Sequence, residues 1–164
     1  MNVARVSGPE IHPDDLFPID VDDLERTSDL IAPFRPETHS IEDLYVIAQM
    51  ATQYLHNGAL RLAVILFEGL VAARPEEIYF RLALGLTYER LGHSARAGRM
   101  YLDARRLAPA DPRPDINLGQ LALIHGEDEV ARRMLASAQR KAAAAGECTL
   151  AERLEARLDL LEAA

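Results

Sequence analysis

The chain has little of what secreted and membrane proteins depend on. Its 164 residues include one cysteine, Cys148, one lysine, Lys141, and no tryptophan. A single cysteine excludes an internal disulfide and fits a reducing cytoplasm. No apolar run approaches about 18 residues, so we expect no membrane-spanning helix. The first 15 residues also lack the apolar stretch of a signal peptide. These absences predict a cytoplasmic protein.

Sequence motifs that carry chemistry are absent as well. The chain contains no phosphate-binding GxxxxGK[ST] or GxGxxG, no HExxH and no GxSxG. His56, His93 and His125 fall near successive turns of a repeat, and helix packing would separate them by about 10 Å, too far to share a metal. We therefore expect no enzymatic activity, catalytic residue, cofactor or bound metal.

What the chain does have is an internal repeat. Three glycines stand 34 residues apart, at Gly58, Gly92 and Gly126. Small and large residues recur at fixed offsets behind them: Ala63, Ala97 and Ala131, then Phe67, Tyr101 and Leu135. A period of 34 with such offsets is typical of the tetratricopeptide repeat, in which two antiparallel helices are joined by a tight turn. Glycine suits that turn because it adopts a left-handed conformation without steric cost.

We predict an all-α fold in which three tetratricopeptide repeats form a right-handed helical solenoid. The repeats are expected at about 44–77, 78–111 and 112–145, within a domain of residues 41–164. Small residues should lie where the two helices of each repeat cross: Ala51, Gly85 and Gly119. Capping boxes at Ser40 with Asp43 and at Thr149 with Glu152 predict helix starts, as do the caps Ser94 and Asp111. The second box opens a capping helix over 150–163, with an apolar stripe of Leu150, Leu154, Leu158 and Leu161.

Residues 1–40 form an acidic, proline-rich arm. Residues 1–43 hold 11 acidic and 3 basic residues, whereas residues 44–164 hold 15 of each, so the net charge of −8 resides in residues 1–43, mostly in the arm. Acid and proline favour a partly disordered segment. Asp20 could cap a short helix, however, and Phe17, Ile31 and Phe34 are large apolar groups. Three interpretations stay open: a partly disordered leader, a dimerisation helix, or a segment packed into the protein's own groove.

A helical solenoid binds other proteins along its concave face, which the first helix of each repeat lines. Partner-binding residues should lie one step off the core positions of those helices: Tyr45, Gln49, Thr52, Leu55, Tyr79, Leu82, Leu86, Arg113, Ile116, Asn117 and Gln120. His56 and Ala83 share the same face. Apolar groups mixed with tyrosines and amides suit an extended peptide. The face lacks most of the converging donors that a clamp for a C-terminal carboxylate requires.

Several runs of residues carry a family resemblance. They are Leu44-Tyr45, Gln53-Tyr54, Leu84-Gly85, Leu91-Gly92, Gly126-Glu127 and, most specifically, Asp111-Pro112-Arg113-Pro114. With them, the chain from Leu44 to about Ala142 resembles the class II chaperones of bacterial type III secretion systems. Those chaperones bind apolar, pore-forming translocator proteins before export. The resemblance implies an extended partner segment in the concave groove. The chain departs from the family in its acidic arm, which stands where a conventional helix usually precedes the first repeat.

Two functions follow from these observations. The favoured one is a cytoplasmic chaperone of a type III secretion substrate. The alternative is a scaffold or adaptor that joins soluble proteins of a bacterial regulatory or motility complex. A chaperone should have an apolar client that aggregates without it, whereas the partners of a scaffold should be soluble on their own. A homodimer through the arm is a further open alternative. We expect no nucleic-acid partner, because the chain is acidic overall, and no membrane insertion.

Overall fold

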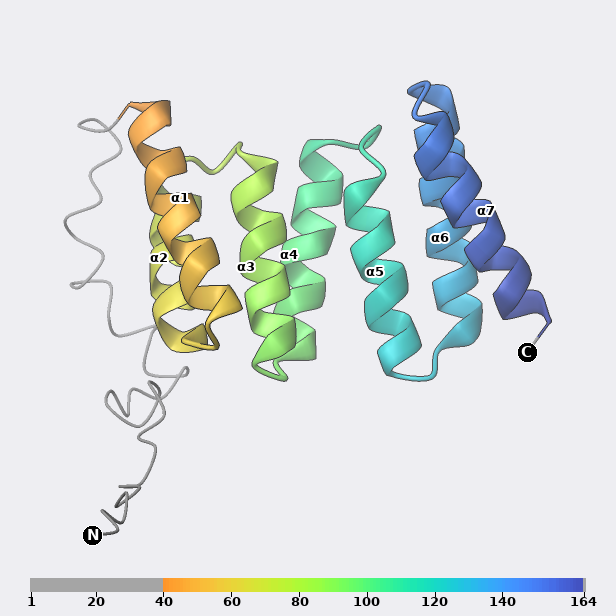
Figure 1. Ribbon diagram of the computed structural model, residues 1–164, viewed down its shortest axis with the longest axis horizontal. Helices are drawn as coiled ribbons and strands as arrows, with labels where there is room; N and C mark the ends of the chain where they lie inside the picture. Colours follow the sequence, from red (N-terminus) through yellow and green to blue (C-terminus); the bar gives the residue numbers. More distant parts are fainter. Residues whose placement is uncertain (1–39, 164) are drawn as a thin grey trace, which may run out of the picture.

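The computed structural model describes residues 40–163, apart from the side chain of Glu162. This part of the chain contains seven α-helices and no strand. The helices run antiparallel to their neighbours and stack into a single row of pairs (Figure 1). Their bounds are α1 Ile41–His56, α2 Leu60–Ala73, α3 Ile78–Arg90, α4 Ser94–Leu107, α5 Arg113–Ile124, α6 Asp128–Ala144 and α7 Cys148–Glu162. The expected helix and docking modes of the arm lie outside the described residues.

The repeat positions form the core. The small residues and the large side chains at the repeated offsets are all fully buried: Ala63, Phe67, Ala97, Tyr101, Ala131 and Leu135. The three turn glycines have φ of +81°, +81° and +70°, which confirms the left-handed turn that only glycine adopts freely. Gly146, which the period does not reach, has φ +76° and makes the same turn between α6 and α7. The fold is therefore the expected tetratricopeptide-like solenoid.

One helix start follows the side-chain cap expected from the sequence, and a second is displaced by one residue. Ser40 accepts a hydrogen bond from the backbone of Asp43, whose carboxylate accepts one from the backbone of Ser40, so the first capping box is confirmed. The expected cap Asp111 lies one residue before the cap position, which Pro112 occupies, although its Oδ1 accepts a hydrogen bond of 2.8 Å from the Arg113 amide. The helix itself begins at Arg113, one residue later than expected from Pro112 at the first helical position.

Two expected caps are wrong. Ser94 is the first residue of α4 and makes no capping bond. The turn at Gly92 places His93 at the cap position, and the His93 amide donates to the Tyr88 carbonyl. Thr149 lies inside α7, which starts at Cys148 for the same reason. The turn at Gly146 places Glu147 at the cap position, and its side chain makes no capping bond. The glycine turns, rather than side-chain caps, set these two starts.

We expect Ser40→Ala to lower the free energy of unfolding by about 1 kcal/mol, because it leaves amides at the first turn of α1 without a partner. Ser94→Ala is the matched control and should lower it by less than about 0.3 kcal/mol, since Ser94 makes no capping bond and alanine favours helix. Urea unfolding of the two variants tests the pair. Equal losses would contradict this assignment of the caps.

The C-terminal end of the solenoid is closed as expected. Ala151 and Leu154 of α7 are buried in a cluster with Leu135, Ala138 and Ala142 of α6. Three further leucines of the expected stripe pack at its edge: Leu150, Leu158 and Leu161. In the described residues, none of the helices combines the length and the apolar character needed to cross a lipid bilayer.

Candidate functional site

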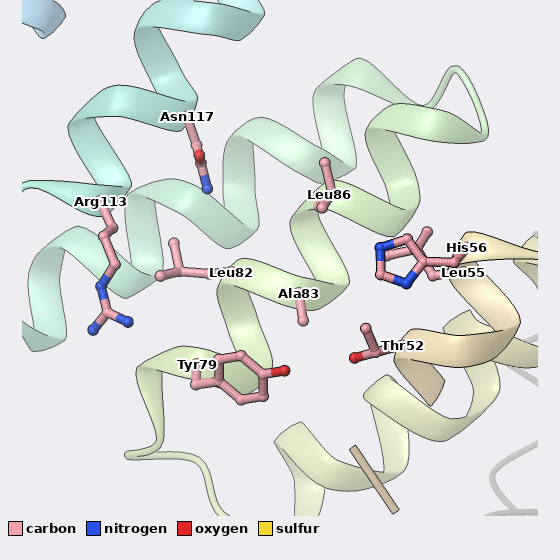
Figure 2. Close-up of a pocket in the computed structure, with 9 residues that line it drawn as sticks. All are labelled: Thr52, Leu55, His56, Tyr79, Leu82, Ala83, Leu86, Arg113 and Asn117. Carbon is pink, nitrogen blue, oxygen red and sulfur yellow. The ribbon is translucent and has the colours of Figure 1, made fainter. Parts of the chain in front are cut away.

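The candidate site is a pocket on the face formed by the first helix of each pair. It has a volume of about 310 Å³ and receives side chains from α1, α3 and α5. Figure 2 shows α3 in the middle, with side chains of α1 and α5 on either side of it. The lining residues are Thr52, Leu55, His56, Tyr79, Leu82, Ala83, Leu86, Arg113 and Asn117.

The pocket gathers most of the side chains that the sequence pattern selects. Seven of the eleven predicted residues line it, and His56 and Ala83 line it as well. Four lie elsewhere. Gln49 is exposed on α1 and Gln120 is half-buried on α5, both outside the pocket lining. Ile116 packs against the C-terminal core cluster. Tyr45 joins an aromatic cluster beside the pocket.

The floor of the pocket is aliphatic, and its leucines differ in exposure. Leu55 is 3% exposed and Leu82 is 8% exposed, so both belong to the core as well as to the pocket wall. Leu86 is 42% exposed and offers its side chain to a ligand. Such a surface gains free energy by covering an apolar side chain of a partner. The difference also makes Leu86, rather than Leu82, the position where binding can be tested without damaging the core.

A fixed cation stands at the α5 end of the pocket. The Arg113 guanidinium meets the Asp111 carboxylate through Nη2–Oδ2 at 2.6 Å and Nε–Oδ1 at 3.1 Å. Burial alone would raise the pKa of the Asp111 carboxyl, but the hydrogen bonds from Arg113 outweigh it and hold that pKa below its usual value. The carboxylate therefore stays ionised and keeps the guanidinium in place. Asn117, one turn further along α5, adds an amide that can both donate and accept.

On α1, Thr52 adds an acceptor. Its hydroxyl donates to the Ala48 carbonyl at 2.8 Å, so the lone pairs of the oxygen remain available on the pocket side. Ala48 itself is 1% exposed and belongs to the core. With Arg113 and Asn117 opposite, the pocket offers donors on one side and an acceptor on the other. That arrangement can satisfy the backbone N–H and C=O groups of an extended peptide.

Aromatic rings continue the pocket face toward the start of α3. The ring of Tyr45 lies 5.9 Å from that of Tyr79 and 5.5 Å from that of Phe80, between centroids. Burial and the neighbouring Glu77 carboxylate raise the pKa of the Tyr45 phenol, so it stays protonated and can donate. Tyr45 is 39% exposed and Tyr79 also lines the pocket. The aromatic cluster therefore extends the apolar surface beyond the aliphatic floor.

Known structures share this architecture. A type III secretion complex from Aeromonas hydrophila aligns at 27% identity and TM-score 0.67, over 76% of this chain and 83% of that chain. PcrH of Pseudomonas aeruginosa, in complex with the chaperone binding region of PopD, aligns at 23% identity and TM-score 0.68, over 77% and 96%. The translocator chaperone SycD of Yersinia enterocolitica aligns at 23% identity and TM-score 0.69, over 74% and 91%.

Neither a protein-family model nor a curated protein sequence matches the chain. The solved structures nevertheless cover about three quarters of it and nearly the whole of PcrH and SycD. They agree with the sequence resemblance carried by the repeat glycines and the Asp111–Pro114 run. In fold, the chain resembles the translocator chaperones of type III secretion.

Proposed function

We propose that this protein is a non-enzymatic chaperone of the bacterial cytoplasm that holds an extended segment of an apolar, export-bound protein in its concave pocket. The observation that carries the proposal is the pocket itself. An aliphatic floor with one exposed leucine lies between a fixed guanidinium and amide on α5 and a hydroxyl acceptor on α1. Apolar anchors and backbone hydrogen bonds are what an extended peptide needs.

The comparisons support the same proposal. PcrH, which has the same fold, is seen in complex with the chaperone binding region of PopD. In this chain the segment would run along α3, between α1 and α5, and place an apolar side chain on Leu86. The eleven residues selected from the sequence remain the proposed contact set, with the seven in the pocket at its centre. A scaffold for soluble proteins would use the same face but would not need to protect its partner from aggregation.

The test begins with the intact chain as bait in a lysate of its source cell, with mass spectrometry to identify bound proteins. Peptides that tile the captured protein are then titrated by fluorescence anisotropy. We expect Leu86→Glu to weaken the best peptide at least tenfold, about 1.4 kcal/mol, because the peptide would bury an unpaired carboxylate. Leu107→Glu is the matched control. Leu107 is 46% exposed on α4, outside the pocket, and its substitution should leave affinity unchanged.

The client's behaviour separates the two functions. A captured protein that is apolar, aggregates when expressed alone and stays soluble with the intact chain supports the chaperone. A partner that is equally soluble with and without the chain identifies a scaffold and rejects the chaperone. If Leu86→Glu and Leu107→Glu bind the peptide as the unsubstituted chain does, the pocket is not the binding site.

A further inference from the structure

The N-terminal end of the solenoid exposes positions that the later repeats bury fully or in part. Val46 and Met50, one turn apart on α1, are 56% and 52% exposed. The repeat of 34 maps Val46 onto Phe80 in α3 and onto Pro114 in α5, and both are fully buried. It maps Met50 onto Leu84, which is 3% exposed. The same positions are therefore core in α3 and surface in α1. We call Val46 and Met50 the end face.

The reason is that these positions pack on the preceding helix pair. In α5 the positions of Val46 and Met50 are Pro114 and Leu118, and Leu121 lies one turn further along the same face. Leu121 lies against α4, since its Cδ2 would be 3.5 Å from a Cβ at Gly98. In α3 and α5 a preceding pair exists, namely α1–α2 and α3–α4 (Figure 1). No described helix precedes α1, so in the described residues no helix pair covers Val46 and Met50. At the opposite end, α7 covers the corresponding surface of α6.

The second helix of the terminal pair, α2, has apolar residues where later repeats have arginine. They are Leu62 and Ile65, which are half-buried, with Ile65 packed against the core, and Ala72, which is exposed. The repeat places arginine at all three of these positions in α4: Arg96, Arg99 and Arg106. In α6 it places arginine at two of them, Arg133 and Arg140. Solenoids need a polar outer surface on their terminal elements. At these three positions α2 has no arginine, so it is less polar there than α4 and α6, as expected if another segment covers this end.

We infer that residues 17–34 of the protein's own acidic arm cover this end of the solenoid, with their apolar side chains on the end face. The segment carries the required groups: Phe17, Leu24, Leu30, Ile31 and Phe34. The connection is short. Five residues lie between Phe34 and Ser40, and the six steps from one to the other can span about 20 Å, whereas Met50 lies about 13 Å along α1 from its start. The arm therefore reaches the end face without strain.

The arm is a better occupant than a second copy of the chain. Its tether sets an effective concentration in the millimolar range, which a free second chain does not match under ordinary conditions. A stable dimer also needs about 800 Å² from each partner, and the end face offers only two large exposed side chains, Val46 and Met50. Two such groups suffice for a tethered segment. They are too few for a dimer built on this surface alone.

Photo-crosslinking of the full-length chain tests the inference independently of any client. In Met50→p-benzoylphenylalanine, irradiation should join position 50 to the Asp-N peptide of residues 29–42, which contains Ile31 and Phe34, within a product of monomer mass. Ile31→Ser combined with Phe34→Ser should reduce that yield at least fivefold. A product of twice the monomer mass, or no crosslink to residues 17–34, would overturn the inference. Mass spectrometry of the digested product reads out all three results.

Two control positions locate the arm. The same photoreactive residue at Ile124, which is 64% exposed near the other end of the solenoid, should give no crosslink to the arm. At Leu86 it reports on the pocket. Arm crosslinks from Leu86 in place of Met50 would put the arm in the groove and reject the end face. Equal arm crosslinks from all three positions would show unspecific contact and reject it too.

Discussion

Replacing Asp115 by alanine is expected to lower the free energy of unfolding by about 3 kcal/mol, because the substitution breaks a buried ion pair. Asp115 is fully buried in the first turn of α5. Its Oδ2 lies 2.7 Å from Lys141 Nζ and accepts a 2.6 Å hydrogen bond from the Ser137 hydroxyl, both on α6. Its Oδ1 lies 3.2 Å from Arg105 Nε on α4, as an ion pair. One carboxylate thus joins three helices.

The cost arises because the alanine variant leaves the cations behind. Lys141 is 18% exposed, so its ammonium would lose a partner at a site where little water can replace it. Arg105 is 39% exposed and can turn toward solvent, which keeps the loss toward the lower end of the range for broken buried pairs. Urea unfolding of the full-length chain, followed by circular dichroism, measures the difference.

Asp103→Ala is the matched control for this prediction. Asp103 also pairs with an arginine, with its Oδ1 2.9 Å from Arg106 Nη1, but the two side chains are 35% and 78% exposed. Exposed pairs of this kind contribute less than about 1 kcal/mol. A loss at Asp115 no greater than that at Asp103 would show that the buried cluster does not stabilise the junction of α4, α5 and α6.

The cluster also shows what the sequence could not reveal. The run from Asp111 to Pro114 predicted the start of the third repeat, and α5 begins within it, at Arg113, whose amide donates to Asp111. Asp115, the next residue, has the pattern of a favourable acid in a first turn. Its partners lie on α4 and α6 and meet it only after the helices stack. Lys141, the single lysine, carries no local signal of its structural role for the same reason. The pattern of neighbouring residues cannot predict ion pairs between side chains on different helices.

The helices themselves were predictable because their determinants are local and repeated. A glycine every 34 residues sets each turn, and the small residue seven positions before it lies at the helix crossing. The pocket was predictable in part. Helical phase selected the faces of α1, α3 and α5 that line the pocket, but the stacking of the helices decides which side chains converge. Gln49 and Gln120 share the right phase and still lie outside the pocket lining. The sequence also did not show which pocket residues are exposed, since Leu82 is buried and Leu86 is exposed although both were predicted on the same face.

The crossing of α3 and α4 gives the second large prediction. Gly85 of α3 lies directly against the ring of Tyr101 on α4. A Cβ at position 85 would stand 2.5 Å from Tyr101 Cε1 and 2.8 Å from Cδ1, distances that force the ring to move. The ring is held in place, because Tyr101 is fully buried and its hydroxyl donates a 2.9 Å hydrogen bond to Glu89 Oε2. We therefore expect Gly85→Ala to lower the free energy of unfolding by about 2 kcal/mol through overpacking.

Gly98→Ala, in the interior of α4, is the control that isolates this contact. A Cβ at position 98 would meet only Leu121 Cδ2, at an ordinary van der Waals distance of 3.5 Å. Alanine is favoured over glycine inside a helix by about 1 kcal/mol, so this variant should be more stable than the unsubstituted chain. The two variants carry the same chemical change inside a helix and should differ by about 3 kcal/mol in urea unfolding. If both were stabilised, the backbone would be able to relax at α3, and the small residue at the crossing would not be a steric requirement of the repeat.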